Sequence, residues 1–171
     1  MAKLAKIEII DLPKVCVVGK LLKVSDEACM SGDNPMPAFW GQCFEENLFG
    51  ILEQQPDFIY DDAYVGWMSD WGTGDGQFSY IVGMLMNEGV TVPDGCVIRE
   101  IPATKAAVGW IQGKDDQSLY SSEHELTDAA LKQAGHSGDG AKWCMELYNC
   151  PRFTTPDENG EVILDYYIPL D

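Results

Sequence analysis

Basic residues are scarce in this chain. Eleven lysines and arginines stand against 28 aspartates and glutamates in 171 residues, and the formal net charge is −17. Such a charge repels a phosphate backbone and leaves no basic stripe of the kind that nucleic-acid binding needs. We therefore expect no direct contact with nucleic acid. The acidic field most simply keeps the protein soluble, and it also favours cationic ligands or a basic protein partner.

Sequence signatures of metal and cofactor sites are also missing. The six cysteines form no CxxC pair, and the two histidines, His124 and His136, lie in no ligand spacing with them. The segment GTGDG at 72–76 lacks the spacing and the lysine of a phosphate-binding loop. No Ser-His or Cys-His motif of a nucleophilic enzyme is present. We expect neither a metal nor a cofactor.

Long apolar runs are absent as well. The first residues carry charges among their apolar positions, and no stretch of 18 apolar residues occurs. These features favour a cytoplasmic protein that is not bound to a membrane and whose cysteines are reduced core residues. Apolar residues still make up 46% of the chain, which is enough for one folded domain over residues 1–171.

The residues that are present predict the same series of elements twice. Each series is a strand interrupted by a proline, a helix with apolar residues three and four apart, and then two further strands. In the first half we expect a strand over 6–18, a loop over 25–37, a helix over 38–55 and a hairpin of 62–71 with 77–86. In the second half we expect a strand over 96–110, a helix over 118–134 and strands over 142–149 and 162–170.

A short sequence match supports this duplication. Asp11-Leu12-Pro13 in the first half corresponds to Glu100-Ile101-Pro102 in the second, and a valine-glycine pair follows each. We place repeat 1 at about 6–88 and repeat 2 at about 96–171. The expected fold is α+β: a duplicated β-α-β-β unit with pseudo-twofold symmetry, whose antiparallel sheet carries two helices on one face and a ligand groove on the other.

The candidate site is built around one carboxylate. Glu146 lies in the run WCMELY, which otherwise favours burial, and alignment of the repeats matches it with Trp67. We expect the two side chains to face each other across the pseudo-twofold axis. A desolvated carboxylate there favours a cationic or hydrogen-bond-donating ligand, or acts as a general acid or base. The alternative is a solvent-facing glutamate on an edge strand.

Strand alternation and the repeat alignment extend this site. Tyr148 shares a face with Glu146, whereas Met145 is expected to point toward the helices. Alignment also matches Tyr64 with Trp143. Tyr64 and Trp110 join the candidate ligand-binding residues as aromatic walls of the groove, and plain core packing is the alternative for each tryptophan.

Three features together resemble the GyrI-like small-molecule-binding domain, the effector-binding part of AraC-type and MerR-type multidrug transcription regulators. They are the repeated layout, the phrase VIREIPATKAAVGW, and the C-terminal segment from Glu146 through Tyr148 and Pro151 to the strand Tyr167-Ile168-Pro169-Leu170. The resemblance covers nearly the whole chain and implies a stand-alone member without a helix-turn-helix segment.

The resemblance implies a ligand in the central groove, with Glu146 as the main polar contact to a lipophilic and often cationic compound. Two other functions remain open for a stand-alone member. One is hydrolysis of strained electrophilic, cyclopropane-type compounds, with Glu146 and Trp67 as catalytic residues. The other is an acidic, gyrase-inhibitor-like protein that acts on a macromolecular partner.

Overall fold

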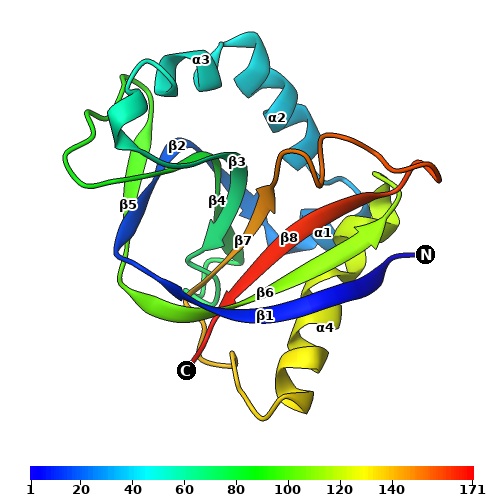
Figure 1. Ribbon diagram of the computed structural model, residues 1–171. Helices are drawn as coiled ribbons and strands as arrows, with labels where there is room; N and C mark the ends of the chain where they lie inside the picture. Colours follow the sequence, from blue (N-terminus) through cyan, green and yellow to red (C-terminus); the bar gives the residue numbers. More distant parts are fainter. The chain divides into compact units, whose positions relative to one another are not determined.

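The computed structural model describes the backbone of residues 1–171 and the side chains of all residues except 29–31 (Figure 1). The chain divides into two compact units. Unit 1 contains Met1–Pro13 and Ala103–Asp171, and unit 2 contains Lys14–Pro102. The α+β class with antiparallel strands, which the sequence predicts, is confirmed.

Unit 1 is a four-stranded antiparallel sheet with one long helix. Its strands lie in the order β1, β6, β8, β7. The elements are β1 (Lys3–Leu12), β6 (Thr104–Gly113), α4 (Gln117–Gln133), β7 (Trp143–Tyr148) and β8 (Val162–Pro169). The expected helix over 118–134 and the last two strands are confirmed.

Unit 2 repeats this plan with shorter helices. Its strands lie in the order β5, β2, β4, β3. The elements are β2 (Val15–Ser25), α1 (Asp26–Ser31), α2 (Met36–Glu45), α3 (Leu48–Leu52), a 3-10 turn η1 (Pro56–Phe58), β3 (Ile59–Ser69), β4 (Gln77–Met86) and β5 (Val97–Ile101). The expected β3–β4 hairpin is confirmed.

The two units have equivalent strand orders because each takes its outer strand from the other repeat. β1 precedes β2 in sequence but pairs with β6, and β5 precedes β6 but pairs with β2. The chain leaves unit 1 after Pro13 and returns to it after Pro102, which are the two matched prolines of the sequence analysis. Proline has no backbone N–H to donate to a neighbouring strand. Each of the two prolines therefore separates a strand that pairs in one unit from the next strand, which pairs in the other unit.

Two expectations for the first half are wrong. The single helix over 38–55 is interrupted at Asn47, which adopts a left-handed conformation with φ 56° and separates α2 from α3. Asparagine tolerates this conformation better than most residues because its short polar side chain bonds locally. The loop over 25–37 contains the helix α1, and Ser25 caps it by accepting a hydrogen bond from the Ala28 N–H.

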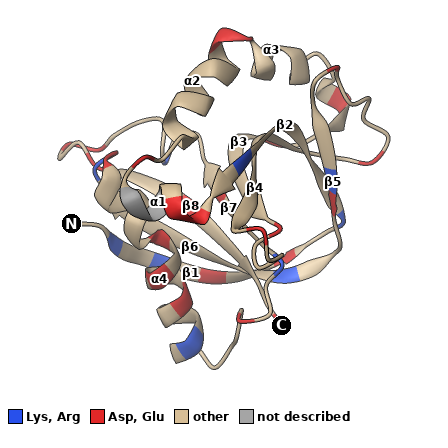
Figure 2. Ribbon diagram, turned by 180° about the vertical axis from the view of Figure 1, so that it is seen from behind, with Lys and Arg blue, Asp and Glu red and all other residues tan. Residues whose placement is uncertain are grey.

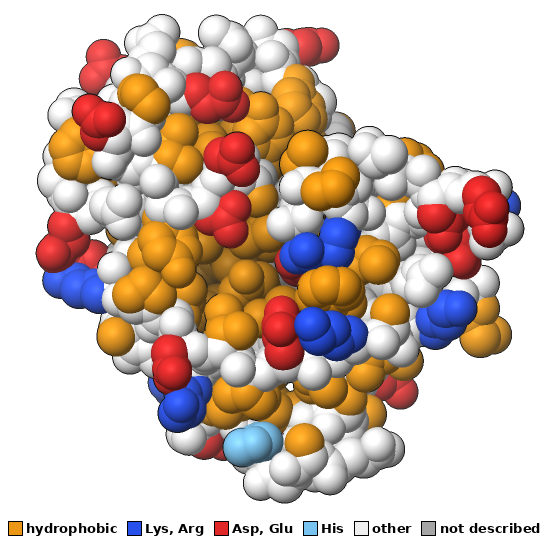
Figure 3. Space-filling model, viewed as in Figure 1, with side chains coloured by type: hydrophobic (Ala, Val, Ile, Leu, Met, Phe, Trp, Pro, Cys, Tyr) orange, Lys and Arg blue, Asp and Glu red, His pale blue; other side chains and the backbone are white. Residues whose placement is uncertain are grey.

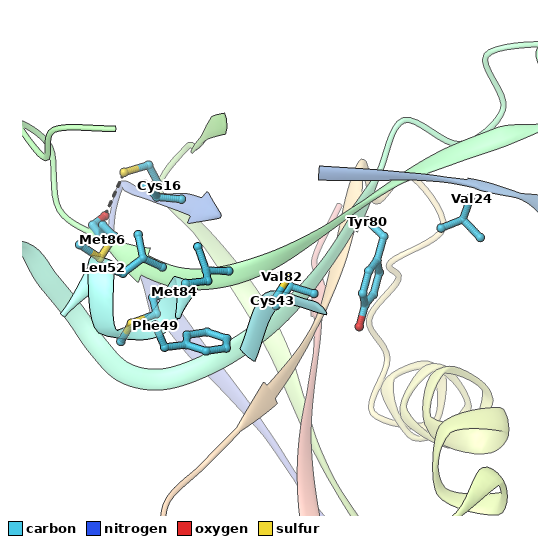
Figure 4. Packing of buried hydrophobic residues seen from close by; sticks show 11 residues of the cluster. Cys16, Val24, Cys43, Phe49, Leu52, Tyr80, Val82, Met84 and Met86 are labelled. Carbon is cyan, nitrogen blue, oxygen red and sulfur yellow. Dashed lines mark hydrogen bonds between the residues drawn. The ribbon is translucent and has the colours of Figure 1, made fainter. Parts of the chain in front are cut away.

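The core of unit 2 lies between its sheet and the helices α2 and α3. Figure 4 shows Phe49 and Leu52 of α3 beside Met84 of β4, together with the hydrogen bond from Cys16 Sγ to the Met86 carbonyl oxygen at 3.2 Å. Unbranched methionine side chains fill irregular spaces of this kind. This core is apolar, and the carboxylate candidate Glu146 belongs to unit 1.

In unit 1 the helix α4 packs on the sheet through residues spaced four apart. Leu119, Glu123, Thr127 and Leu131 are buried along one stripe. The stripe fits closely because β6 carries Gly109: a Cβ atom there would lie 2.3 Å from Thr127 Oγ1. Two of the four stripe residues are polar, and Glu123 is brought against the sheet by this packing.

Replacement of Gly109 by alanine is expected to destabilise the protein by about 1–3 kcal/mol, because α4 must move away from β6. Chemical denaturation measures the change. Gly41→Ala is the control, because no atom outside the α2 backbone and the flanking residues lies within 4 Å of its added Cβ; it should leave the free energy of unfolding unchanged or raised by up to ~1 kcal/mol. Equal stability of the Gly109→Ala protein and the wild type would contradict the close approach of α4.

Candidate functional site

A pair of buried glutamates joins α4 to the sheet of unit 1. Glu123 is 7% exposed and Glu146 is 6% exposed. A side-chain hydrogen bond connects their carboxyl groups. Glu146 is held at the centre of β7, where it is the cross-strand partner of Tyr166 on β8. A carboxyl–carboxyl hydrogen bond requires a proton on one of the two groups.

The surroundings of Glu123 favour its protonated form. Burial raises the pKa of Glu123 well above its ordinary value of 4.5, and the charge and hydrogen bond of Glu146 raise it further. The pair therefore consists of a neutral acid at Glu123 that donates to Glu146. The Oε2 atom of Glu123 is buried and accepts no hydrogen bond from an N–H or hydroxyl donor of the described residues.

Two tyrosines and a thiol lie near the pair. A 2.9 Å hydrogen bond joins His124 Nδ1 to the Tyr166 hydroxyl, whose pKa burial raises well above its ordinary value. Burial also raises the pKa of the Cys144 thiol to about 11. The Tyr120 hydroxyl donates to Asp115 at 2.5 Å, and burial raises its pKa too. The described groups that shift the pKa of Glu123 include no lysine or arginine.

The pair lies on the face of the sheet that α4 covers. Gly109, against which Thr127 packs, is the cross-strand partner of Tyr166, and Tyr166 is the partner of Glu146. Directly opposed residues of antiparallel strands share a face. The expectation that Glu146 points away from the helices, with Met145 toward them, is therefore wrong in unit 1.

Of the other candidates in unit 1, Tyr148 follows Glu146 by two residues and shares its face. It is half-buried and packs edge-on against Phe153, with ring centroids 4.7 Å apart. Tyr148 thus lies in the same strand and on the same side as the acid pair, at the end of β7.

Trp110 lies on the opposite face of the unit 1 sheet. Its cross-strand partner is Asp165, which forms an ion pair with Arg152 at 2.5 Å. The Arg152 guanidinium lies 4.1 Å from the centroid of the indole ring, and the Lys6 ammonium lies 4.6 Å from it. Both cations belong to the protein, so the Trp110 ring already has cation–π partners. The structure does not bring Trp110 to Glu146.

The two candidates of unit 2 point to opposite faces of β3. Tyr64 stacks on Phe49 of α3 with ring centroids 3.6 Å apart, and its hydroxyl donates to Glu53 at 2.9 Å. Trp67, three residues later, is 4% exposed and is the cross-strand partner of Ile81. Tyr64 is therefore a packing residue of the helical side. The approach of Trp67 to Glu146 joins the two units and stays a prediction.

Glu123 is the site residue that the sequence analysis missed. The predicted apolar face of its helix included Leu119 and Leu131, and Glu123 lies four and eight residues from them. A glutamate in the middle of that series is the signal that could have identified it. Figure 2 shows acidic positions along α4, and only the burial of Glu123 separates it from the others.

Figure 3 shows acidic side chains spread between areas of apolar surface on the face in view. No group of His, Cys, Asp and Glu suited to a metal ion occurs in the part of the chain that could be searched. None of the described helices is both long and apolar enough to span a membrane.

The proton at Glu123 gives the stability of the protein a defined pH dependence. Because the pKa of Glu123 is raised on folding, the folded protein keeps a proton that the unfolded chain loses above about 4.5. This contribution is complete below pH 4.5 and is lost as the pH rises toward the folded pKa. Glu123→Gln should therefore flatten the fall of the unfolding free energy above pH 4.5, measured by denaturation at several pH values. Parallel curves for the two proteins would refute the protonated acid.

Solved structures with the same fold are diverged in sequence. They include SAV2435 bound to tetraphenylphosphonium (14% identity, TM-score 0.69, covering 97% of this chain and 94% of that one). They also include an integron cassette protein from Vibrio cholerae (14%, 0.56, 99% of both chains). A third is a hydrolase from Listeria innocua (11%, 0.53, 99% and 93%). A search of curated proteins gave no match.

A family model identifies the chain directly. The model of the Cass2 integron-associated effector-binding proteins matches residues 8–170, and the C-terminal domain of EcmrR shares the fold. The match spans both units and includes Glu123 and Glu146. The chain belongs to the family of integron-associated effector-binding proteins, and it is a GyrI-like effector-binding domain.

Proposed function

We propose that this protein binds a lipophilic organic cation at the Glu123–Glu146 pair, as an effector-binding or drug-sequestering protein. The observation that supports the proposal most is the burial of two neighbouring carboxyl groups, Glu123 and Glu146, beside the Cys144 thiol. A negative charge inside a protein is costly to desolvate, and a bound cation with an apolar body adds both an opposite charge and apolar packing.

The surroundings of the pair suit such a ligand. Tyr120 and Tyr166 offer aromatic surface, which attracts cations through the ring faces. Tyr148 extends this surface along β7. The relative SAV2435 was solved with tetraphenylphosphonium, which is a lipophilic cation. The acidic charge of the whole chain adds attraction at long range and disfavours nucleic acid as a direct partner.

Tetraphenylphosphonium is expected to bind the wild type and to raise its melting temperature. Glu146→Gln keeps the shape of the side chain and removes its charge, so the dissociation constant should rise by about tenfold or more, measured by isothermal titration calorimetry. Uncharged triphenylphosphine oxide is the matched ligand and should bind weakly to both proteins. Equal affinity of the Glu146→Gln protein, or equal binding of the uncharged compound, would refute a charge-based site.

Hydrolysis of a strained electrophile is the second candidate function. The observation that favours it is the hydrogen-bonded acid pair, since one protonated and one ionised carboxyl group suit a general acid and a general base. In that reaction Glu146 takes a proton from water while the water oxygen forms a bond to one ring carbon. The ring C–C bond at that carbon breaks, and the other carbon of the broken bond takes the proton of Glu123. The fold is shared with a hydrolase from Listeria innocua.

Incubation with a cyclopropane-bearing electrophile should then yield a product heavier by one water molecule, detected by mass spectrometry. Both Glu146→Gln and Glu123→Gln are expected to abolish the product while their melting temperatures remain near that of the wild type. Product formation at the wild-type rate by either variant would exclude the pair as the acid and base. Binding of the compound without any product leaves the cation-binding function as the better description.

A further inference from the structure

The strand β1 is an edge strand of unit 1. It pairs with β6 along its inner side, and no strand pairs with its outer side in the part of the chain that the structure describes (Figure 1). Its backbone makes no hydrogen bond to a described loop or turn either. Alternate residues of an edge strand point their N–H and C=O groups away from the sheet. β1 therefore offers a row of backbone donors and acceptors to another strand.

A bulge limits the part of β1 that can pair regularly. The register with β6 shifts between Leu4 and Lys6, and from Lys6 to Leu12 the two strands pair without interruption. Pro13 follows directly, and proline has no N–H for a further pair. Bulges and prolines commonly end the pairing of edge strands. The segment available to a second strand is therefore 6–12.

The charges of this segment suit one kind of partner. Lys6 and Glu8 lie two residues apart on the same face of β1, with the lysine ammonium 3.4 Å from the glutamate carboxylate. Their side chains are 50% and 38% exposed. Charged side chains on an edge strand usually keep other strands away. A second copy of β1 that runs antiparallel about Ile7 instead places each lysine opposite a glutamate.

Within residues 6–12, only the centre at Ile7 opposes unlike charges. Residues that face each other across a twofold axis perpendicular to a sheet lie on the same side of it, so they are an even number of positions apart. Asp11, the third charged residue of the segment, is an odd number of positions from Lys6 and cannot face it in this way. The same pairing covers Ile9, which is 38% exposed.

We propose that β1 is a dimerisation edge: two copies of this chain pair their β1 strands antiparallel about Ile7, with Lys6 of each copy opposite Glu8 of the other. The four charges then alternate in sign across the axis. The pairing closes at two copies, because each β1 has one outer side. One strand from each copy is a small interface, and the net charge of −17 on each copy opposes association, so the dimer is weak. The inference does not depend on the proposed ligand site.

Charge reversal tests this pairing, measured by sedimentation equilibrium over a range of protein concentrations. The wild type should form dimers as the concentration rises. Lys6→Glu and Glu8→Lys each place like charges opposite one another, and each should raise the dissociation constant by about tenfold or more. An equimolar mixture of these two variants should associate as the wild type does, because every lysine of one chain then faces a glutamate of the other.

The other edge strand, β5, supplies matched controls. Arg99→Glu changes the net charge as Lys6→Glu does, and Glu100→Lys changes it as Glu8→Lys does. Both β5 variants should dimerise as the wild type does. Lys6 and Glu8 also have contacts within their own chain, so melting temperatures check that each variant is folded.

Three results would overturn the assignment. A wild type that stays monomeric at every concentration would show that β1 pairs with no second copy. Dimers of Lys6→Glu and Glu8→Lys that are as tight as those of the wild type would place the interface elsewhere. A mixture of the two variants that associates no more tightly than either variant alone would contradict the register about Ile7.

Discussion

Two carboxyl groups buried in contact are the constraint on which this structure depends. Glu123 and Glu146 are both more than nine-tenths buried, and two ionised carboxylates at that place would repel each other strongly. One proton shared in a hydrogen bond removes most of that cost and leaves one negative charge. A cation brought by a ligand would be attracted to that charge.

The fold of unit 1 provides the contact. α4 approaches β6 closely because Gly109 has no side chain, and the four-residue spacing from Leu119 to Thr127 then aims Glu123 at β7. Tyr166 lies between these elements, as partner of Gly109 on one side and of Glu146 on the other. Unit 2 has an equivalent strand order, but apolar residues fill the space between its sheet and its helices, as Met84 of β4 and Phe49 of α3 show. The duplicated plan therefore carries the acid pair in one copy only.

The sequence was informative where the pattern of burial is regular. The strands, the long helix and the duplication follow from apolar periodicity and from the two acid-aliphatic-proline matches, and Glu146 stands out as a charge in an apolar strand. The break at Asn47 was missed because the apolar spacing continues across it. The exchange of β1 and β5 was missed because strand pairing between repeats leaves no local signal. Glu123 was missed because a glutamate on a helix is normally solvated.

Carbon-13 NMR of glutamate carboxyl groups observes the proton of the Glu123–Glu146 pair directly. The signals of the pair are assigned by their disappearance in the Glu123→Gln and Glu146→Gln variants, and a pH titration follows them in the ligand-free protein. The carboxyl carbon of Glu123 should keep the chemical shift of a protonated acid well above pH 4.5, and its titration should change when Glu146 is replaced. Titration of both carbons near 4.5, each independent of the other, would contradict it.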